Sequence, residues 1–153
     1  MTSILSGEKI ASLTKRLISA KKQINSCSID LTVRCISLVG LGGHLDFGGS
    51  EYKEASSSPL TPEKRTPDEP YGWWNLGSGN YLVQFNEILT PPEGSLIMIF
   101  PHERIVAAGI SHPPIAVDKL DENLCVNLVV GQEGISIKEN ARVSKAVLLL
   151  QEI

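Results

Sequence analysis

The sequence lacks the features that mark exported, membrane-spanning or nucleic-acid-binding proteins. None of its apolar runs approaches the ~18 continuous residues that a membrane-spanning helix requires. The first residues scatter charges among apolar positions, unlike the basic start and apolar block of a secretory signal. Positive charge is also scarce, because 14 Lys and Arg face 17 Asp and Glu without a basic stripe. We therefore expect a cytoplasmic protein with no membrane and no nucleic-acid partner.

Cysteine is rare too. Cys27, Cys35 and Cys125 are odd in number, widely spaced and surrounded by apolar neighbours. A disulfide framework or a zinc site would need more cysteines, or ligands at closer spacing. The pattern predicts three buried, reduced thiols in the core.

The N-terminal third changes from helical to strand periodicity. Residues 6–18 place apolar side chains on one helical face, with Ser6 as a cap and Glu8 in the first turn, so we predict a helix there. From Ile29 to Cys35, apolar and polar residues alternate, which predicts a half-buried strand.

In two segments we expect few side chains to pack into a core. Five glycines crowd residues 40–49, where turns or a loose hairpin are expected. Residues 53–70 contain four prolines, three consecutive serines and many charges, which indicate an exposed loop.

The second half repeats short strands separated by turns. This arrangement predicts a single antiparallel barrel or sandwich, in one domain spanning residues 1–153. The predicted strands are 81–89, 95–100, 124–130, 135–137 and 142–150.

Four segments follow one another in a recognisable order: ILSGEKI (4–10), Ser28-Ile29-Asp30-Leu31, residues 79–110 and residues 140–147. In this order they resemble the motifs of the dUTPase and dCTP deaminase superfamily, particularly its archaeal branch. The first resembles the opening of that branch and the second its first motif. The third resembles the strand, proline-glycine turn and strand that lead into the second motif, and the fourth resembles the closing motif. The resemblance implies an all-β, dUTPase-like (β-clip) antiparallel barrel or sandwich with a short N-terminal helix.

The resemblance also implies a ligand. Members of the family form homotrimers with active sites where subunits meet, and many hydrolyse dUTP to dUMP and diphosphate. The expected ligand is a deoxynucleoside triphosphate, dUTP first, with Mg bound to its phosphates and no metal cluster of the protein's own. A triphosphate carries about four negative charges, so its site needs cations. Hydrolysis also needs a carboxylate that deprotonates water.

Carried onto this chain, the family motifs assign the following roles. Asp118 matches the water-activating aspartate of the third motif; a solvated turn aspartate is the alternative. Arg104, Arg142 and Lys145 are candidate phosphate ligands. The alternatives are an ion pair between Arg104 and a nearby acid such as Glu103, and outward-facing strand positions for the other two.

Asp30 matches the aspartate of the first motif, which in the family supports the subunit interface and the network of metal-bound water. Because this role is partly structural, Asp30 supports the fold more than the activity.

Four departures from the family pattern weaken the expectation of activity. His102-Glu103-Arg104 stands where the family has Arg-Ser-Ser, and a carboxylate there would repel phosphate. The third motif keeps Asp118 but lacks the family's aromatic ring and glycines. Asn127 occupies the nearest match to the glutamate of dCTP deaminases, and an amide is no proton shuttle, so deamination is not expected. The glycine-rich C-terminal arm of typical dUTPases is also expected to be absent.

The largest aromatic cluster is Trp73-Trp74 beside Tyr71. We expect it to anchor the edge of the core or a trimer interface, with ligand stacking as the alternative. His102 is expected at the surface or at an interface if it binds no phosphate.

Three hypotheses follow. The first is a divergent dUTPase with weak or lost activity. The second is a non-catalytic trimer of the same fold, acting in nucleotide binding, regulation or scaffolding. The third is an unrelated small β-barrel binding module. The departures favour a family member whose hydrolase activity is weak or lost.

Overall fold

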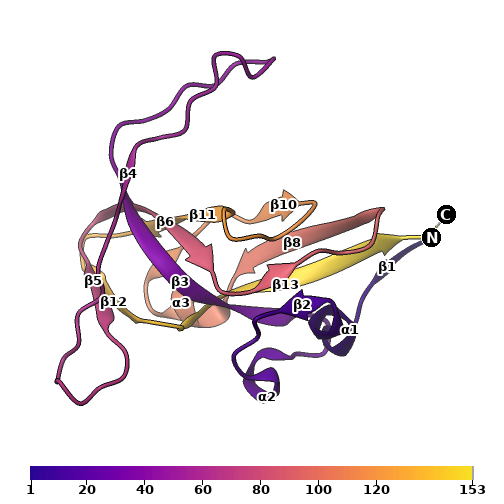
Figure 1. Ribbon diagram of the computed structural model, residues 1–153, viewed down its shortest axis with the longest axis horizontal. Coiled ribbons are helices and arrows are strands. Elements are labelled where there is room, and N and C mark those ends of the chain that lie inside the picture. Colours follow the sequence, from indigo (N-terminus) through magenta and orange to yellow (C-terminus); the bar gives the residue numbers. More distant parts are fainter. Residues whose placement is uncertain (153) are drawn as a thin grey trace.

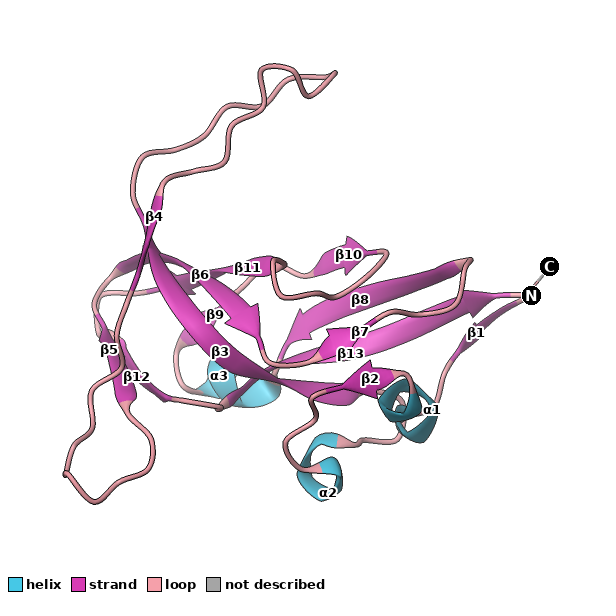
Figure 2. Cartoon of the chain, viewed as in Figure 1, coloured by secondary structure: helices cyan, strands magenta, loops and turns pink. Residues whose placement is uncertain are grey.

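The computed structural model describes residues 1–152, and in this part of the chain strands dominate (Figures 1 and 2). A curled nine-stranded sheet has the order β10-β8-β13-β3-β6-β11-β9, with β1 added beside β13 and β4 beside β3. Every pair of neighbouring strands is antiparallel. Two small ribbons, β12-β5 and β2-β7, complete the β structure. The predicted all-β antiparallel fold is confirmed.

The elements have the following bounds. The strands are β1 (Thr2–Ile4), β2 (Thr14–Lys15), β3 (Ile29–Val39), β4 (Ser57–Pro59), β5 (Trp73–Leu76), β6 (Gly79–Phe85), β7 (Ile88–Leu89), β8 (Ser95–Pro101), β9 (Ile110–Ser111), β10 (Ile115–Val117), β11 (Cys125–Val130), β12 (Ile135–Lys138) and β13 (Arg142–Gln151). The helices are α1 (Gly7–Ser12), α2 (Ala20–Gln23) and α3 (Glu103–Ala107).

Strand β3 joins the two halves of the sheet. Its first residues pair with β13 and its later residues with β6, and the register shifts between Val33 and Cys35 where the partner changes. The strand predicted from Ile29 is confirmed, but the predicted half-burial is wrong for its first five residues, which are buried on both faces. Asp30 is only 1% exposed and Thr32 only 2%, so these polar side chains need partners inside the protein.

The predicted helix over residues 6–18 is too long. The Ser6 cap is confirmed, since its hydroxyl accepts from the Lys9 N–H at 3.2 Å, but the helix ends at Ser12. The next residues, Thr14 and Lys15, pair with β7, and the Thr14 hydroxyl donates to the Ile10 carbonyl at 2.7 Å. Strand pairing with a distant segment therefore replaces the helical continuation that the periodicity favoured.

Residues 40–56 form an extended arm that projects away from the sheet (Figure 1). Paired backbone hydrogen bonds between His44 and Lys53, of 2.8 and 3.0 Å, hold its two sides together. Phe47 near its tip is fully exposed. The expected loose hairpin is confirmed. Residues 53–70 are mostly exposed, including the short strand β4.

All three cysteines are free thiols, as predicted, but none is fully buried. Cys27 is exposed, whereas Cys35 and Cys125 are half-buried. Burial raises the pKa of the Cys125 thiol and keeps it neutral. The prediction of three buried core cysteines is therefore wrong, most clearly for Cys27, which lies in the turn before β3. None of the helices within residues 1–152 is long and apolar enough to cross a membrane.

Candidate functional site

A cavity of about 570 Å³ opens between α3, the start of β13, the β5-β12 ribbon and the segment around α2. Its charged lining residues are Lys22, Arg104, Lys138 and Arg142. No Asp or Glu within residues 1–152 lines it. We call it the cationic cavity. Cations that line a common space with no acid in its wall repel one another, so the cavity favours an anionic ligand.

Arg142 is the most firmly held of these cations. Its Nη1 donates to Asp30 Oδ2 at 3.1 Å and to the Lys22 carbonyl at 2.9 Å. The other carboxylate oxygen of Asp30 accepts from Asn25 Nδ2 at 2.8 Å. The Arg142 side chain is still 25% exposed. Asp30 therefore orients Arg142 in the cavity wall. Its predicted role at a subunit interface and in a network of metal-bound water remains a prediction.

His102 is part of the same cluster. It caps the N-terminus of α3, where its Nδ1 accepts from the Arg104 backbone N–H at 3.0 Å. Nδ1 is thus an acceptor, the proton is on Nε2, and Nε2 lies 3.4 Å from Asp30 Oδ2. The side chain is only 4% exposed, so the expected surface or interface position is wrong. The ring can be buried because both of its nitrogens have partners, the Asp30 carboxylate and the first turn of α3.

Arg104, the second predicted phosphate ligand, is an exposed residue of α3 and lines the cationic cavity. The expected ion pair between Glu103 and Arg104 does not form. Glu103 instead pairs with Lys145, whose Nζ lies 2.7 Å from Oε2, and this bond lowers the pKa of Glu103 to about 2. Within residues 1–152, no carboxylate forms an ion pair with Arg104.

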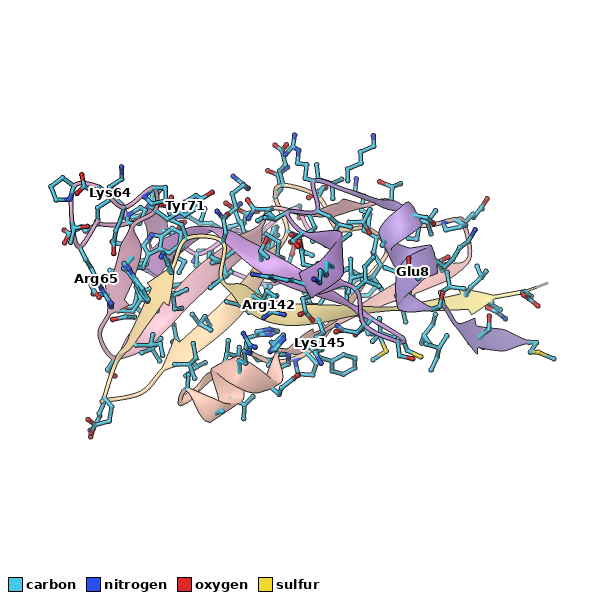
Figure 3. All side chains as sticks on the ribbon, turned by 90° about the horizontal axis from the view of Figure 1, so that it is seen from below. Glu8, Lys64, Arg65, Tyr71, Arg142 and Lys145 are labelled. Carbon is cyan, nitrogen blue, oxygen red and sulfur yellow. The ribbon has the colours of Figure 1, made fainter. Side chains whose placement is uncertain are left out.

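Lys145 lies on β13 close to Arg142 (Figure 3) but does not line the cavity. Its charge is engaged by Glu103, so it compensates the carboxylate that the sequence places where the family has a phosphate-binding serine. Binding of phosphate by Lys145 remains a prediction.

Asp118 lies apart from these residues. It is exposed, in the bend that follows β10, and it does not line the cationic cavity. The neighbouring turn contains an exposed pair between Lys119 and Asp121, with 3.7 Å between Nζ and Oδ2. A single chain therefore brings Arg104 and Arg142 together but not the predicted base.

A buried glutamate, Glu87, supports the floor of the cavity. It is 0% exposed and accepts from the Thr32 N–H at 2.7 Å, the Thr32 hydroxyl at 2.6 Å and Gln23 Nε2 at 3.0 Å. Burial raises its pKa, against the opposing effect of these donors. Gln23 in turn accepts from the N–H groups of Ile18 and Ser19, which hold the cavity wall. Sequence reasoning missed Glu87, although it continues the inward series through Val83 and Phe85, where an acid is unusual.

The β5-β12 ribbon forms the remaining wall. Trp74 is buried in the core and its indole N–H donates to the Leu60 carbonyl at 3.0 Å, so the predicted anchor is confirmed for this residue. Trp73, its neighbour, is half-buried and lines the cavity opposite in register to Lys138. Lys22 and Lys138 were not predicted, because isolated lysines have no local pattern that distinguishes them from surface residues.

Side chains that commonly bind metal ions do not gather at one place within residues 1–152. No group of three or more His, Cys, Asp or Glu is placed to hold a metal ion there. The Asp30 carboxylate is occupied by Arg142 and Asn25.

Comparison with known proteins gives a consistent result, although no family model matches the chain. The chain is 27% identical over 135 residues to the probable deoxyuridine 5'-triphosphate nucleotidohydrolase of Methanosarcina mazei, covering 86% of this chain and 74% of that protein. The protein of the same name from Methanosarcina acetivorans matches with the same identity and coverage.

Among solved structures, 2'-deoxycytidine 5'-triphosphate deaminase from Agrobacterium tumefaciens shares the fold, with a TM-score of 0.65 at 15% identity. The match covers 98% of this chain and 47% of the deaminase, so the chain spans about half of its length.

Proposed function

Because the chain belongs to the dUTPase and dCTP deaminase superfamily, we propose that it hydrolyses dUTP to dUMP and diphosphate. The observation that carries the proposal is the cationic cavity, in which four cations face a common space without an acid. A lining of this kind attracts a polyanion such as a triphosphate.

The cations divide into two kinds. Arg142 is preoriented by Asp30, so little conformational freedom is lost when it binds a phosphate. Arg104, Lys22 and Lys138 have no ion pair within residues 1–152 and are available to the ligand. Magnesium on the triphosphate would neutralise the developing charge, and the protein's cations would bind the remaining phosphate oxygens.

Asp118 is proposed as the base, acting in a cavity of another copy of the chain within a homotrimer. The support is that Asp118 is exposed and lies outside the cationic cavity of its own chain. In the reaction, a water oxygen bonds to the α-phosphorus as the bond to the bridging oxygen of the diphosphate breaks. The proton of that water passes to Asp118, and diphosphate leaves with the bond electrons.

Diphosphate release from dUTP and from dCTP in the presence of magnesium tests this proposal. We expect turnover of dUTP, and a loss of at least a hundredfold in Asp118→Asn, the scale of a general base. Asp121→Asn is the matched control, since it removes an exposed carboxylate of the same turn and should leave turnover unchanged. A folded wild-type protein without turnover of either nucleotide would refute the hydrolase.

Mixing two inactive variants tests the shared site. Copies with Asp118→Asn lack the base and copies with Arg104→Ala lack a phosphate ligand. If one copy supplies the base to another, exchange of subunits between the variants restores part of the turnover. No recovery after verified exchange would place the base and the cations in the same chain.

A further inference from the structure

Trp73 differs from every other aromatic residue in the chain by its position in the cavity wall. The ring lies on β5 beside Lys138 of β12, on the wall of the same cavity that holds the four cations. The turn that carries Asp118, residues 117–123, contains no aromatic side chain. If a nucleotide occupies the cavity, Trp73 is the aromatic surface next to its phosphate ligands.

The ring is covered by a cation. The guanidinium carbon of Arg65 lies 3.6 Å from the ring centroid, the spacing of a stacked planar group, and Lys138 Nζ lies 5.6 Å from it. Figure 3 shows Arg65 beside Lys64 on the loop at the end of the ribbon, away from Arg142. The loop is anchored by two backbone bonds between Glu63 and Trp73, of 2.8 and 2.9 Å.

The indole N–H of Trp73 is buried and has no acceptor within residues 1–152. Buried donors are nearly always paired, so this N–H is a donor available to an acceptor on a ligand. The cover is a good candidate for movement, because Arg65 is exposed and its backbone N–H makes only one long bond, 3.2 Å to Glu69 Oε2. Moving Arg65 would free one face of the ring.

We propose that Trp73 binds the base and deoxyribose of the nucleotide, and that Arg65 leaves the ring as the nucleotide enters. A pyrimidine base is planar like the guanidinium and stacks at the same spacing, and its carbonyl oxygens are acceptors for the indole N–H. The displaced Arg65 keeps its charge in solvent or on a phosphate. The inference rests on the proposed use of the cationic cavity as a nucleotide site.

Calorimetric titration with two probes tests it. One probe is the α,β-imido analogue of dUTP, which is not cleaved between these phosphates, and the other is inorganic triphosphate, which has no base. We expect Trp73→Leu to weaken binding of the analogue about tenfold, the scale of one base-aromatic stack, and to leave triphosphate affinity within about twofold. Trp73→Phe, which keeps a ring but no N–H, should lie between wild type and Trp73→Leu. Arg65→Ala should bind the analogue as tightly as wild type or a few-fold tighter, since it removes the cover.

Tryptophan fluorescence adds a readout that a purely structural role would not change. The chain has two tryptophans, and Trp74 is buried with its N–H already bonded. The analogue should quench wild-type emission, and the quench should disappear in Trp73→Phe and persist in Arg65→Ala. Inorganic triphosphate should cause little quenching.

The outcomes separate this inference from the hydrolase proposal. Equal loss of both probes in Trp73→Leu, or no loss of either, would overturn the role of Trp73, whatever the turnover. Arg104→Ala should weaken both probes alike and serves as the matched control for the phosphate ligands. Selective loss of the analogue without any turnover by wild type would support Trp73 and refute only the hydrolase. A folded wild-type protein that binds neither probe would refute both.

Discussion

Replacing Asp30 by Asn removes one buried charge while keeping the shape of the side chain. In the native protein, Oδ2 faces the Arg142 guanidinium and the Nε2–H of His102, whereas Oδ1 accepts from Asn25. An amide has one acceptor and one donor end. In either orientation its N–H₂ therefore meets a donor, and Arg142 loses its only carboxylate partner within residues 1–152.

The expected cost follows from burial. Breaking a buried ion pair on one side typically lowers the free energy of unfolding by ~3–5 kcal/mol. The Asp30 side chain is 2% exposed but that of Arg142 is 25% exposed and keeps its bond to the Lys22 carbonyl, so water compensates part of the loss. We expect a decrease of about 2–3 kcal/mol in Asp30→Asn, together with weaker binding of inorganic triphosphate because Arg142 is no longer oriented.

Urea unfolding at one protein concentration measures the change, and thermal unfolding should show a fall of roughly 5–10 °C for a chain of this size. The matched control is Glu122→Gln, which breaks the pair between Arg16 Nη1 and Glu122 Oε1. That pair is short, 2.6 Å, but its side chains are 54% and 52% exposed, so a loss below about 1 kcal/mol is expected. Equal losses in the two variants would refute the reasoning that burial makes the Asp30 contact stronger.

Three further predictions concern groups outside the cavity. His112 is held neutral because burial lowers its pKa and the Ser144 hydroxyl lies 2.8 Å from Nε2. Its contribution to the free energy of unfolding is thus complete above pH 6.5 and lost as pH falls through the lowered pKa. Urea titrations from pH 5 to 8 should show a flatter decline in His112→Gln, and an unchanged slope would contradict this. Gly7→Ala should lower the free energy of unfolding by about 3 kcal/mol in urea, since a Cβ there would lie 1.8 Å from the Asn25 carbonyl oxygen. A loss below about 1 kcal/mol would mean that the backbone around Asn25 moves aside easily. Phe47→Ser on the arm should change the free energy of unfolding by less than about 0.5 kcal/mol, because the ring is fully exposed, and a larger loss would reveal a contact that the ring makes.

The strands were predictable from the sequence because alternation is a local property. Side chains at every second position of a strand share a face, so the pattern from Ile29 to Cys35 and the repeats after residue 80 identify β3, β6, β8, β11 and β13 without knowledge of their neighbours. The projecting arm was predictable for a similar reason, since clustered glycines leave little to bury. The length of the first helix was not, because β2 pairs with a strand more than 70 residues away in the chain.

The chemistry of the candidate site depends on side-chain contacts that the alternation of apolar and polar residues does not encode. The sequence and its resemblance indicated Arg104, Arg142 and Asp30, but only the fold joins Asp30 to Arg142 across 112 positions and buries His102 beside them. Only the fold directs Glu103 to Lys145.

The same holds for Lys22, Lys138 and Trp73, which come to one cavity from three separate elements. A strand pattern determines the face on which a side chain lies. The charge or ring that it meets there is decided by the packing of segments far apart in the chain, because each ion pair needs two groups within a few ångströms and the intervening residues do not specify that distance.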